Sequence, residues 1–267
     1  MGVVVCASSS VPVPPKPQLR ILTQNCCLLP HHLFQSGGDD NRSQRAQLIH
    51  QMVQRYDIVL LQEVFGTHWC SEWRELFKEV PGMSSLLSVK GGDKLTDSGL
   101  VILSRYPIIK SSFQRFHSKS FTNSVLDRGF LYGAIQVGEK VVHVVNTHLN
   151  PSECHYGPLP AAEYRRRQVQ EIKNFRAASG YENGQWVIGG DFNDESVVFQ
   201  LSPMYITFAN EKLPTSHSLV PYSIADNGAH ICIDYLVTTA PQIYYRRVET
   251  LISDHYGVET AIAYHSL

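Results

Sequence analysis

The sequence predicts an α/β fold in which two β-sheets pack against each other and helices cover the outer faces of the sheets. The first observation is a series of short apolar runs with the two-residue alternation of strands, which recur from about residue 19 to the end of the chain. The second is that only a few segments show the spacing of apolar residues expected of a helix. Many strands and few helices are typical of packed sheets with helices outside.

Composition sets the scale of this fold. The chain has 267 residues, of which 43% are apolar, so it is long enough to bury one large core. Residues 8–17 (SSSVPVPPKP) are rich in proline, which cannot continue a helix or a central strand. We therefore expect a flexible proline-rich leader over residues 1–18 and a single domain over residues 19–267.

The first half of the domain is predicted to alternate between strands and helices. Residues 19–25 (LRILTQN) alternate like a strand, whereas residues 57–65 (DIVLLQEVF) form an apolar run that indicates a buried strand. Between them, residues 42–56 place five apolar side chains on one helical face: Ala46, Ile49, Met52, Val53 and Tyr56. We also expect a helix over residues 68–80 and strands over residues 84–90 and 98–105.

The second half contains the clearest local signal, a hairpin. Residues 128–137 and 140–150 are strand-like and flank the tight pair Gly138-Glu139. The other expected elements are a helix over 161–175, a strand that enters GGDFND (189–194), a short helix near 195–202, an irregular stretch over 203–228, and strands over 231–239, 244–252 and 257–264.

Cysteine usage and hydropathy bear on the cellular compartment. The sequence contains no C-x-x-C pair, and we interpret all six cysteines as reduced thiols of an intracellular protein: Cys6, Cys26, Cys27, Cys70, Cys154 and Cys232. No stretch approaches the roughly 20 apolar residues of a membrane span, and the first ten residues lack the basic flank of a secretory signal. We expect the protein in the cytoplasm or at the periphery of intracellular membranes.

The first residues allow two interpretations. Gly2 followed by Cys6 is a distant variant of the N-myristoylation pattern, which has Ser or Thr where Cys6 stands. N-terminal lipidation at these residues is one interpretation, and a frayed terminus is the other.

The charge balance gives no general attraction for polyanions. There are 23 basic and 24 acidic residues, which leaves a formal net charge of -1. Contacts from basic side chains to phosphates dominate the affinity of proteins for nucleic acids, so the sequence carries no strong nucleic-acid signal. The run Arg165–Arg167 lies in a predicted helix, where consecutive side chains point about 100° apart, and we interpret it as solvated helix surface rather than one phosphate-binding patch.

Polar residues gather at the ends of the predicted strands. Each of six apolar runs ends in or near side chains that a core would exclude, and these side chains are Asn25, Glu63, Asn146, His148, Asn150, Asp191, Asn193, Asp234, Asp254 and His255. A single such residue can belong to an ordinary turn, and Asp, Asn and Gly in GGDFND are also turn residues. Their repetition over six strands indicates a shared pocket where the strands end.

The residue types in this set indicate a class of chemistry. Carboxylates and amides without cysteine suit a hard cation, Mg²⁺ above all with Mn²⁺ as the alternative, because such ions prefer oxygen ligands. Two histidines beside carboxylates offer a general base and a general acid. The sequence has no serine nucleophile elbow, no P-loop and no dinucleotide fingerprint. Together these features favour hydrolysis of a phosphate ester by an activated water.

At this point the motifs themselves show a resemblance. TQN, LQEVF, DSGLVILSRYPI, NTHL, GGDFN, IDYL and SDHYGVE, in this order and spacing, resemble the endonuclease/exonuclease/phosphatase superfamily from about Leu19 to the end of the chain. Within it, NRSQRAQLI, LLQEVF, DSGLVILSRYPI, RGFLYGAI and RRRQVQEI are most similar to neutral sphingomyelinases. The resemblance implies a DNase-like four-layer sandwich of two mainly antiparallel sheets flanked by helices, and one catalytic domain.

The resemblance also implies roles for individual residues. Glu63 resembles the principal Mg²⁺ ligand, with Asn25 beside it and Asp254 as a secondary metal or network contact. Asp191 and Asn193 match the pair that orients the attacking water and binds the phosphate. His255 resembles the general base and Asp234 its orienting carboxylate. His148 would protonate the leaving oxygen or stabilise phosphate charge, supported by Asp97, although turn chemistry explains Asp97 almost as well.

Several substrates and one non-enzymatic function remain open. The leading hypothesis is a phospholipase-C-like enzyme that releases phosphocholine from sphingomyelin or a lyso-lipid, with peripheral membrane contact. A nuclease, an inositol-polyphosphate phosphatase and an inactive lipid- or protein-binding scaffold are the alternatives. Secreted bacterial sphingomyelinases have a longer, aromatic-tipped hairpin before the final SDH strand, whereas only residues 235–253 separate Asp234 from Asp254 here. The oligomeric state has no sequence signal.

Overall fold

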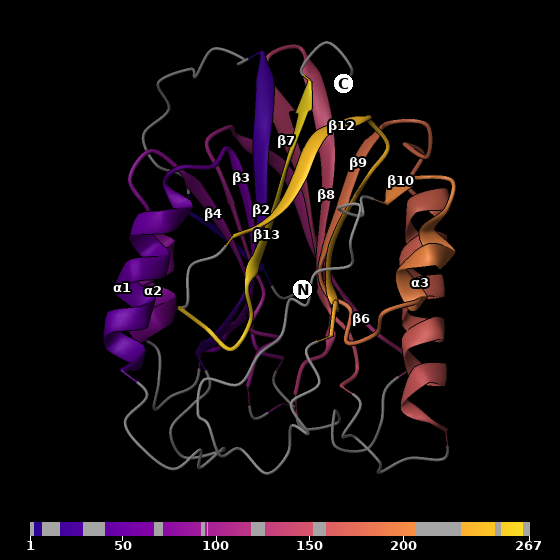
Figure 1. Ribbon diagram of the computed structural model, residues 1–267, viewed down its shortest axis with the longest axis horizontal. Coiled ribbons are helices and arrows are strands. Elements are labelled where there is room, and N and C mark those ends of the chain that lie inside the picture. The colour runs from indigo at the N-terminus through magenta and orange to yellow at the C-terminus, as the bar shows by residue number, and fades with distance from the viewer. Residues whose placement is uncertain are drawn as a thin grey trace.

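Two β-sheets stand face to face between helices in the computed structural model of the chain, which describes residues 3–6, 17–28, 41–66, 72–91, 94, 96–118, 126–151, 159–206, 231–248 and 252–263. In Figure 1, α1 (Arg42–Val53) and α2 (Glu72–Lys78) lie on one side of the sheets, and α3 (Ala161–Ala178) lies on the other. The predicted α/β class and the four-layer arrangement are confirmed.

In chain order the strands are β1 (Val3–Cys6), β2 (Gln18–Leu28), β3 (Ile58–Val64), β4 (Ser84–Ser88), β5 (Val101–Ser104), β6 (Ile108–Arg115), β7 (Gly129–Val137), β8 (Lys140–His148), β9 (Gln185–Asp191), β10 (Tyr205–Ile206), β11 (Asp234–Thr238), β12 (Gln242–Val248) and β13 (Gly257–Ala263). The first sheet has the order β1-β4-β5-β3-β2-β13-β12, and the second has the order β10-β11-β9-β8-β7-β6.

Each sheet contains one parallel pair among antiparallel neighbours. These pairs are β2 with β3 in the first sheet and β8 with β9 in the second. A helix connects the two strands of each pair, α1 in one case and α3 in the other, as a parallel connection requires. Because β2 and β3 pack against β8 and β9 across the sheets, the carboxyl ends of four strands meet at one edge of the molecule.

Three hydrophobic clusters fill the spaces between the four layers. The middle cluster lies between the sheets and includes Ile21, Leu60 and Leu236. The outer clusters lie under α1 and α2 on one side and under α3 on the other. Of the five residues predicted on the apolar face of the first helix, four lie in α1, and Tyr56 is buried just beyond its end.

Two edge strands differ from the sequence expectations. Residues 3–6, which we assigned to a flexible leader, form β1 and pair with β4, so that assignment is wrong for this segment. Three consecutive valines, which favour extended backbone, explain why it adds to the sheet edge. The strand β6 was not predicted, because IIKSSFQR carries many polar residues and its burial is only partial, as at a sheet edge.

The hairpin prediction is confirmed in detail. β7 and β8 pair through the register Val137↔Lys140, and Gly138 has a φ of 59°. A residue with a Cβ is disfavoured in that left-handed region, which explains glycine at this turn. The expected short helix near 195–202 is the 3₁₀ helix η2 (Val197–Leu201).

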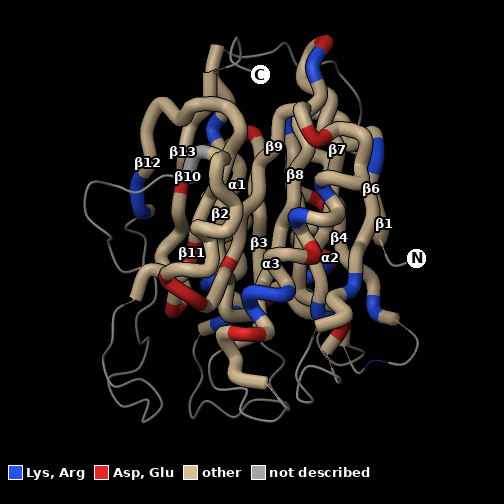
Figure 2. The backbone as a smooth tube through the Cα atoms, turned by 90° about the vertical axis from the view of Figure 1, so that its right-hand side faces the viewer, with Lys and Arg blue, Asp and Glu red and all other residues tan. Residues whose placement is uncertain are grey.

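The described residues also show the distribution of charge, the length and polarity of the helices, and the state of four cysteines. Basic and acidic positions are interleaved along the chain in Figure 2. None of the helices in the described part is both long and apolar enough to cross a membrane. Cys6, Cys26, Cys27 and Cys232 are free thiols, whereas Gly2, Cys70 and Cys154 lie outside the described residues.

Candidate active site

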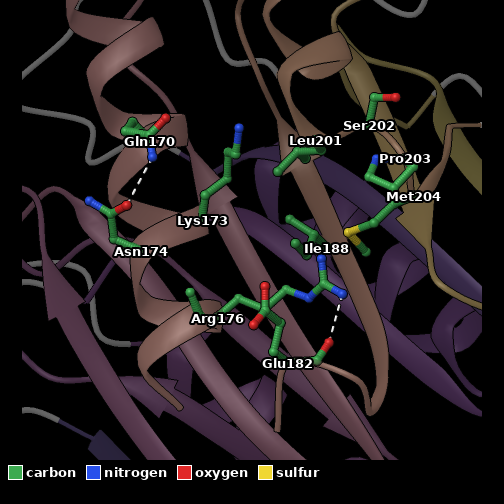
Figure 3. Close-up of a pocket in the computed structure, with 11 residues that line it drawn as sticks. Gln170, Lys173, Asn174, Arg176, Glu182, Ile188, Leu201, Ser202, Pro203 and Met204 are labelled. Carbon is green, nitrogen blue, oxygen red and sulfur yellow. Dashed lines mark hydrogen bonds between the residues drawn. The ribbon is translucent and has the colours of Figure 1, made fainter. Parts of the chain in front are cut away.

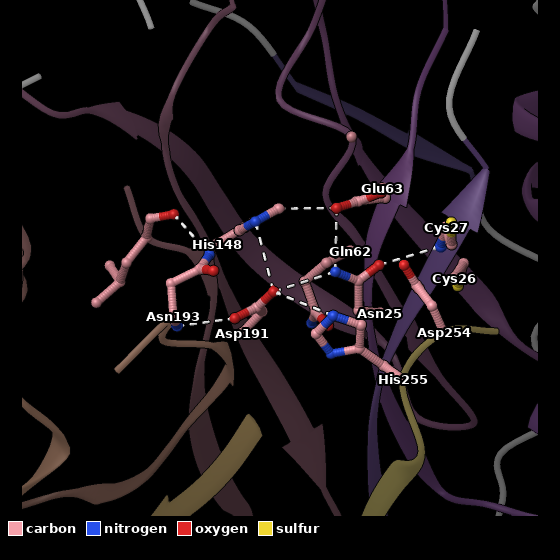
Figure 4. Close-up of polar contacts among 12 residues, drawn as sticks. Asn25, Cys26, Cys27, Gln62, Glu63, His148, Asp191, Asn193, Asp254 and His255 are labelled. Carbon is pink, nitrogen blue, oxygen red and sulfur yellow. Dashed lines mark hydrogen bonds and ion pairs between the residues drawn. The ribbon is translucent and has the colours of Figure 1, made fainter. Parts of the chain in front are cut away.

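The polar residues predicted at strand ends meet at the edge where β2, β3, β8 and β9 finish. In the second sheet, His148 is aligned with Asp191, and Asp191 is aligned with Asp234, so three neighbouring strands present side chains at one level. Asn25 and Glu63 come from the first sheet, and His255 precedes β13. Figure 4 shows that the side chains of Asn25, Glu63, His148, Asp191 and His255 point toward one another from both sheets.

Asn25 joins the two sheets at the centre of this group. Its Nδ2 donates to Glu63 Oε1 and to Asp191 Oδ2, each at 3.1 Å, and its Oδ1 accepts from the backbone N–H of Cys27. The two carboxylate oxygens therefore lie at most twice 3.1 Å apart. The expectation that Asn25, Glu63 and Asp191 converge on one space is confirmed.

Asp191 lies between two histidines. Its Oδ2 is 3.5 Å from His148 Nε2 and 3.9 Å from His255 Nε2. The other ring nitrogen of His255, Nδ1, is 2.7 Å from Asp234 Oδ2, as expected of an orienting carboxylate. His255 therefore turns Nε2 toward the centre of the site, and the expected hydrogen bond to Asp234 is confirmed.

The glycines before Asp191 are explained by close packing. A Cβ on Gly190, where φ is 140°, would lie 1.9 Å from the carbonyl oxygen of Thr147, and one on Gly189 would lie 2.6 Å from a Leu236 methyl carbon. Only glycine allows β9 to approach its neighbours this closely. Beyond the strand, Asn193 has a φ of 50°, and its N–H donates to Asp191 Oδ1 at 2.8 Å. The GGDFND run therefore aims the carboxylate of Asp191 at the site.

The carboxylates of the site are buried and destabilise one another. Burial, followed by the charge of Asp254, raises the pKa of Glu63. Burial, followed by the charge of Asp234, raises the pKa of Asp191 to about 7. Asp254 is half-buried and accepts from the hydroxyl of Ser253. Buried like charges of this kind are stabilised by a bound cation, and the carboxylate oxygens of Glu63 and Asp191 are of the type that Mg²⁺ prefers.

A second group of ligand atoms lies beside the first. Asp191, Asp234 and His255 each offer one atom, and these atoms lie within 4.8 Å of one another. The short contact between His255 Nδ1 and Asp234 occupies one donor of this group, whereas Glu63 offers carboxylate oxygens alone. Asn25 turns Nδ2 toward the site, so it would offer its Oδ1 to a cation only after its amide rotates. The donor set around Glu63 therefore fits a hard cation better.

The two histidines differ in their electrostatic setting. Burial lowers the pKa of His148 well below its ordinary value, and the charge of Arg128 lowers it further, so its imidazole is neutral. Burial alone would also lower the pKa of His255, but the carboxylates of Asp234 and Asp191 outweigh it and raise the pKa well above the ordinary value. Two imidazoles with opposite shifts in one site are typical of a division between acid and base roles.

Asp97 does not lie where the sequence analysis placed it. Its carboxylate accepts from the backbone N–H groups of Gly66 and Gly99 and forms an ion pair with Arg74. His148 Nδ1 is buried and has no hydrogen-bond partner among the described residues. The expected support of His148 by Asp97 is therefore wrong, because Arg74, which the sequence analysis did not consider, attracts the carboxylate.

Two further residues of the site region, Gln62 and Arg128, were missed, whereas Asn146 was among the polar residues predicted at strand ends. Gln62 Nε2 donates to Asn146 Oδ1 at 2.7 Å, and Asn146 Nδ2 donates to backbone carbonyls of β3 and β5, so this pair ties the sheets together beneath the site. Arg128 is buried, and its Nη1 lies 3.4 Å from the carbonyl oxygen of His148. Polar residues within the apolar strand runs were the sequence signal for the Gln62–Asn146 pair, since buried polar groups need partners.

The three consecutive arginines of α3 divide into two classes. Arg166 and Arg167 are exposed and pair with Glu163, in line with solvated helix surface. Arg165 is buried, pairs with Asp194 at 3.0 Å and donates to the carbonyl oxygen of Asn150 at 3.1 Å. The prediction of a solvated side chain is therefore wrong for Arg165, which fastens the ends of β8 and β9 to α3.

A separate pocket of about 250 Å³ lies beside the C-terminal half of α3. Figure 3 shows Lys173 and Arg176 of the helix on one side and Leu201 and Met204 on the other. The residues that line it include none of the predicted site residues. The polar cluster at the strand ends is thus distinct from this pocket.

Comparison with known proteins places this geometry in a family. The model of the Endonuclease/Exonuclease/phosphatase family matches residues 22–255. The chain is 25% identical over 253 residues to a sphingomyelinase C from Bacillus cereus, and the match covers 83% of this chain and 75% of the relative.

Solved structures share the fold. The crystal structure of SmcL superposes with a TM-score of 0.76 at 22% sequence identity, covering 92% of this chain and 99% of that one. A beta toxin variant from Staphylococcus aureus, solved with bound magnesium ions, gives a TM-score of 0.67 at 19% identity over 92% of this chain and 99% of that one. These similarities agree with the two-sheet architecture.

Proposed function

The chain belongs to the endonuclease/exonuclease/phosphatase family, and from this premise we propose that it is a Mg²⁺-dependent phosphodiesterase that cleaves a choline phospholipid. Sphingomyelin, hydrolysed to ceramide and phosphocholine, is the first substrate we assign. Mn²⁺ is the alternative ion. The observation that carries the proposal is Asp191, which lies between two histidines and shares Asn25 with Glu63.

Each residue of the site has a proposed task. His255, held by Asp234, turns Nε2 toward Asp191 and would accept the proton of the attacking water. Asp191 and Asn193 would orient that water and the phosphate. His148 is neutral, so its single N–H would donate a hydrogen bond to the phosphate or the leaving oxygen.

The cation would be held by Glu63 and Asn25, with Asp191 or Asp254 as further ligands. When bound, such an ion supplies positive charge that stabilises the oxyanion forming on the phosphate and offsets the carboxylates that keep His255 protonated. The raised pKa values of Glu63 and Asp191 support a cation at this place.

The choice of substrate rests on relatives and on charge. The Bacillus cereus relative is named sphingomyelinase C, and the motifs that resemble neutral sphingomyelinases include NRSQRAQLI and RGFLYGAI, which hold none of the predicted site residues. A net charge of -1 lowers the expectation for a nucleic-acid substrate. Only three residues separate β11 from β12, which leaves no long hairpin at that connection to enter a bilayer.

We also propose a cellular location for the protein. Cys26 and Cys232 are buried and are not joined in a disulfide, which supports a reducing compartment, in the cytoplasm or at the face of intracellular membranes. Lipidation at Gly2 or Cys6 would add membrane contact. Comparison of detergent-dispersed and vesicle-bound sphingomyelin tests this point, and we expect poor cleavage of intact vesicles.

A panel of phosphodiesters tests the proposed activity. Release of phosphocholine from dispersed sphingomyelin and lyso-choline lipids would be compared with cleavage of plasmid DNA, abasic DNA and soluble inositol phosphates, with Mg²⁺ and with EDTA. We expect a choline lipid to have the highest kcat/KM and EDTA to stop the reaction. Faster turnover of a nucleic acid or an inositol phosphate would overturn the lipid assignment, and no turnover of any substrate would favour an inactive scaffold.

A further inference from the structure

We propose that Asp97, paired with Arg74, is a positioning residue for Glu63 rather than a partner of His148. The inference rests on the proposed function, in which Glu63 holds the cation. It assigns to Asp97 and Gly99 the task of keeping the Glu63 backbone in the conformation that points its carboxylate at Asn25.

Glu63 has a backbone conformation that needs support. Its φ is 59°, in the left-handed region that residues with a Cβ rarely adopt. Such a conformation persists only where the surrounding structure enforces it, and it is common at functional sites. In this conformation Glu63 Oε1 lies 3.1 Å from Asn25 Nδ2.

The turn that contains Asp97 provides this support. Asp97 Oδ1 accepts from the N–H of Gly99 at 2.7 Å, and Oδ2 accepts from the N–H of Gly66 at 3.1 Å. The carbonyl oxygen of Gly99 in turn accepts from the N–H of Val64 at 2.9 Å. The chain that leaves Glu63 is therefore held at Val64 and at Gly66 by the segment 97–99.

Gly99 allows this segment to touch Glu63. A Cβ at Gly99, where φ is 67°, would lie 3.2 Å from Glu63 Cα and 3.0 Å from the ring of Phe65. Any side chain at this position would push against the Glu63 backbone itself. The contact requires glycine for space and for conformation alike.

Arg74 stabilises the buried carboxylate of Asp97. Asp97 is 2% exposed, and Arg74 pairs with its Oδ2 while donating to the carbonyl oxygen of Ser88. A buried carboxylate without a cation would be strongly destabilising. Arg74 belongs to α2 and Ser88 to β4, so contacts to this helix and this strand hold Asp97 in place.

Replacement of one carboxylate oxygen of Asp97 should weaken the contacts that hold the Glu63 backbone. In Asp97→Asn, the side-chain NH₂ would face a backbone N–H or Arg74, because both oxygens of Asp97 accept from donors in the wild-type protein. Two N–H donors then face each other with no acceptor between them, and the backbone of Glu63 is no longer held in its left-handed conformation. Residues that orient metal ligands without touching the metal typically change affinity about 10- to 100-fold when replaced.

The test measures metal binding without substrate. Free Mn²⁺ would be counted by electron paramagnetic resonance in titrations of the wild-type protein, Asp97→Asn and Gly99→Ala, with Mg²⁺ as competitor. We expect both variants to bind Mn²⁺ about 10- to 100-fold more weakly. At saturating Mg²⁺ their kcat should return toward the wild-type value, because the histidines are untouched.

Asp57→Asn is the matched control. Asp57 is equally buried, accepts from the backbone N–H of Arg20 at 2.9 Å and faces Arg105 at 3.7 Å, but it precedes β3 at the end away from Glu63. This variant should lose stability with unchanged Mn²⁺ affinity. Melting curves and circular dichroism would establish that each variant is folded at the assay temperature.

The outcomes separate this inference from the proposed function. Absence of Mn²⁺ and Mg²⁺ binding to the wild-type protein would remove the proposed metal site itself. If Asp97→Asn and Gly99→Ala are folded and bind Mn²⁺ with the affinity of the wild-type protein, the positioning role is overturned. If the Mn²⁺ affinity of the variants is unchanged but their kcat stays low at saturating Mg²⁺, the result would indicate that Asp97 supports His148 instead.

Discussion

At the scale of single residues, His255 is the group whose proposed role can be tested most directly. His255→Ala removes the ring that bridges Asp234 and Asp191, while its neighbours keep their backbone contacts. We expect kcat to fall by about 10²- to 10⁴-fold, the usual contribution of a general base. Steady-state kinetics on dispersed sphingomyelin would measure the loss.

His117→Ala is the control for this substitution. The side chain of His117 is 94% exposed and contacts Glu171 of α3, away from the strand ends. It should retain wild-type kinetics. If His255→Ala also retained near-wild-type turnover, His255 would have no place in the mechanism.

The sequence predicted the residues that face the site, but it did not predict the residues that hold them in place. Asn25, Glu63 and Asp191 lie at or near the ends of apolar strands and His255 just precedes one, so their position predicted a common edge. The partner of Asp97 was not predictable in this way. Arg74 is separated from it by 23 positions, and only the packing of α2 on the sheet brings the two together.

At the scale of elements, the close approach of β8 and β9 depends on Gly190. In Gly190→Ala the new Cβ would overlap the carbonyl of Thr147, so the two strands must separate. We expect a loss of more than about 4 kcal/mol in the free energy of unfolding, in the exceptional range for one substitution. Urea denaturation of the variant would measure it.

Gly180→Ala distinguishes packing from backbone strain. Gly180 has a φ of 78°, but nothing lies within 4 Å of the position where a Cβ would be. Its cost should be about 1–2 kcal/mol, the penalty of a left-handed residue with a Cβ. Equal losses for the two variants would contradict the close-packing explanation of the glycine pair.

The pair of buried Arg165 and half-buried Asp194 connects α3 to the ends of β8 and β9. Arg165→Ala leaves Asp194 and the carbonyl oxygen of Asn150 without this donor, and we expect a loss of about 1.5–3 kcal/mol in the free energy of unfolding, the range for hydrogen bonds to charged groups. The neighbouring Arg167→Ala removes only an exposed pair with Glu163 and should cost less than about 0.5 kcal/mol. Similar denaturation midpoints for the two variants would argue against this structural role.

The elements themselves were predicted well where one face is buried. The alternation in β2 and the apolar run in β3 are direct results of burial between packed layers. The edge strands β1 and β6 were missed because they are only partly buried: β6 carries many polar residues, and the apolar β1 is a run of four residues just before the proline-rich stretch 8–17. Pairing of an edge strand depends on its neighbour, which a local pattern does not contain.

At the scale of the whole molecule, a bound cation should stabilise the fold. Burial and the neighbouring carboxylates of Asp254 and Asp234 raise the pKa values of Glu63 and Asp191, so their ionised forms are destabilised in the folded protein as long as no cation is bound. Mg²⁺ at about 100 times its dissociation constant would add about 2.7 kcal/mol. For a domain of this size we expect the melting temperature to rise by about 5–10 °C.

Differential scanning calorimetry with Mg²⁺, with EDTA and with sodium chloride of matched ionic strength would measure this shift. Sodium chloride should leave the melting temperature unchanged. A melting temperature that responds equally to both salts would indicate general screening of charge and no specific site.

The hydrogen bond from Asn25 to Asp191 has a consequence for the kinetics of folding. It joins residues 166 positions apart, one from each sheet, so it can form only after both sheets have been built and have met. Contacts of such large separation along the chain form slowly, because loop closure must precede them. In refolding from urea, far-ultraviolet circular dichroism should therefore recover before enzymatic activity does. Activity that returned together with the first secondary structure would mean that the two sheets meet at the start of folding.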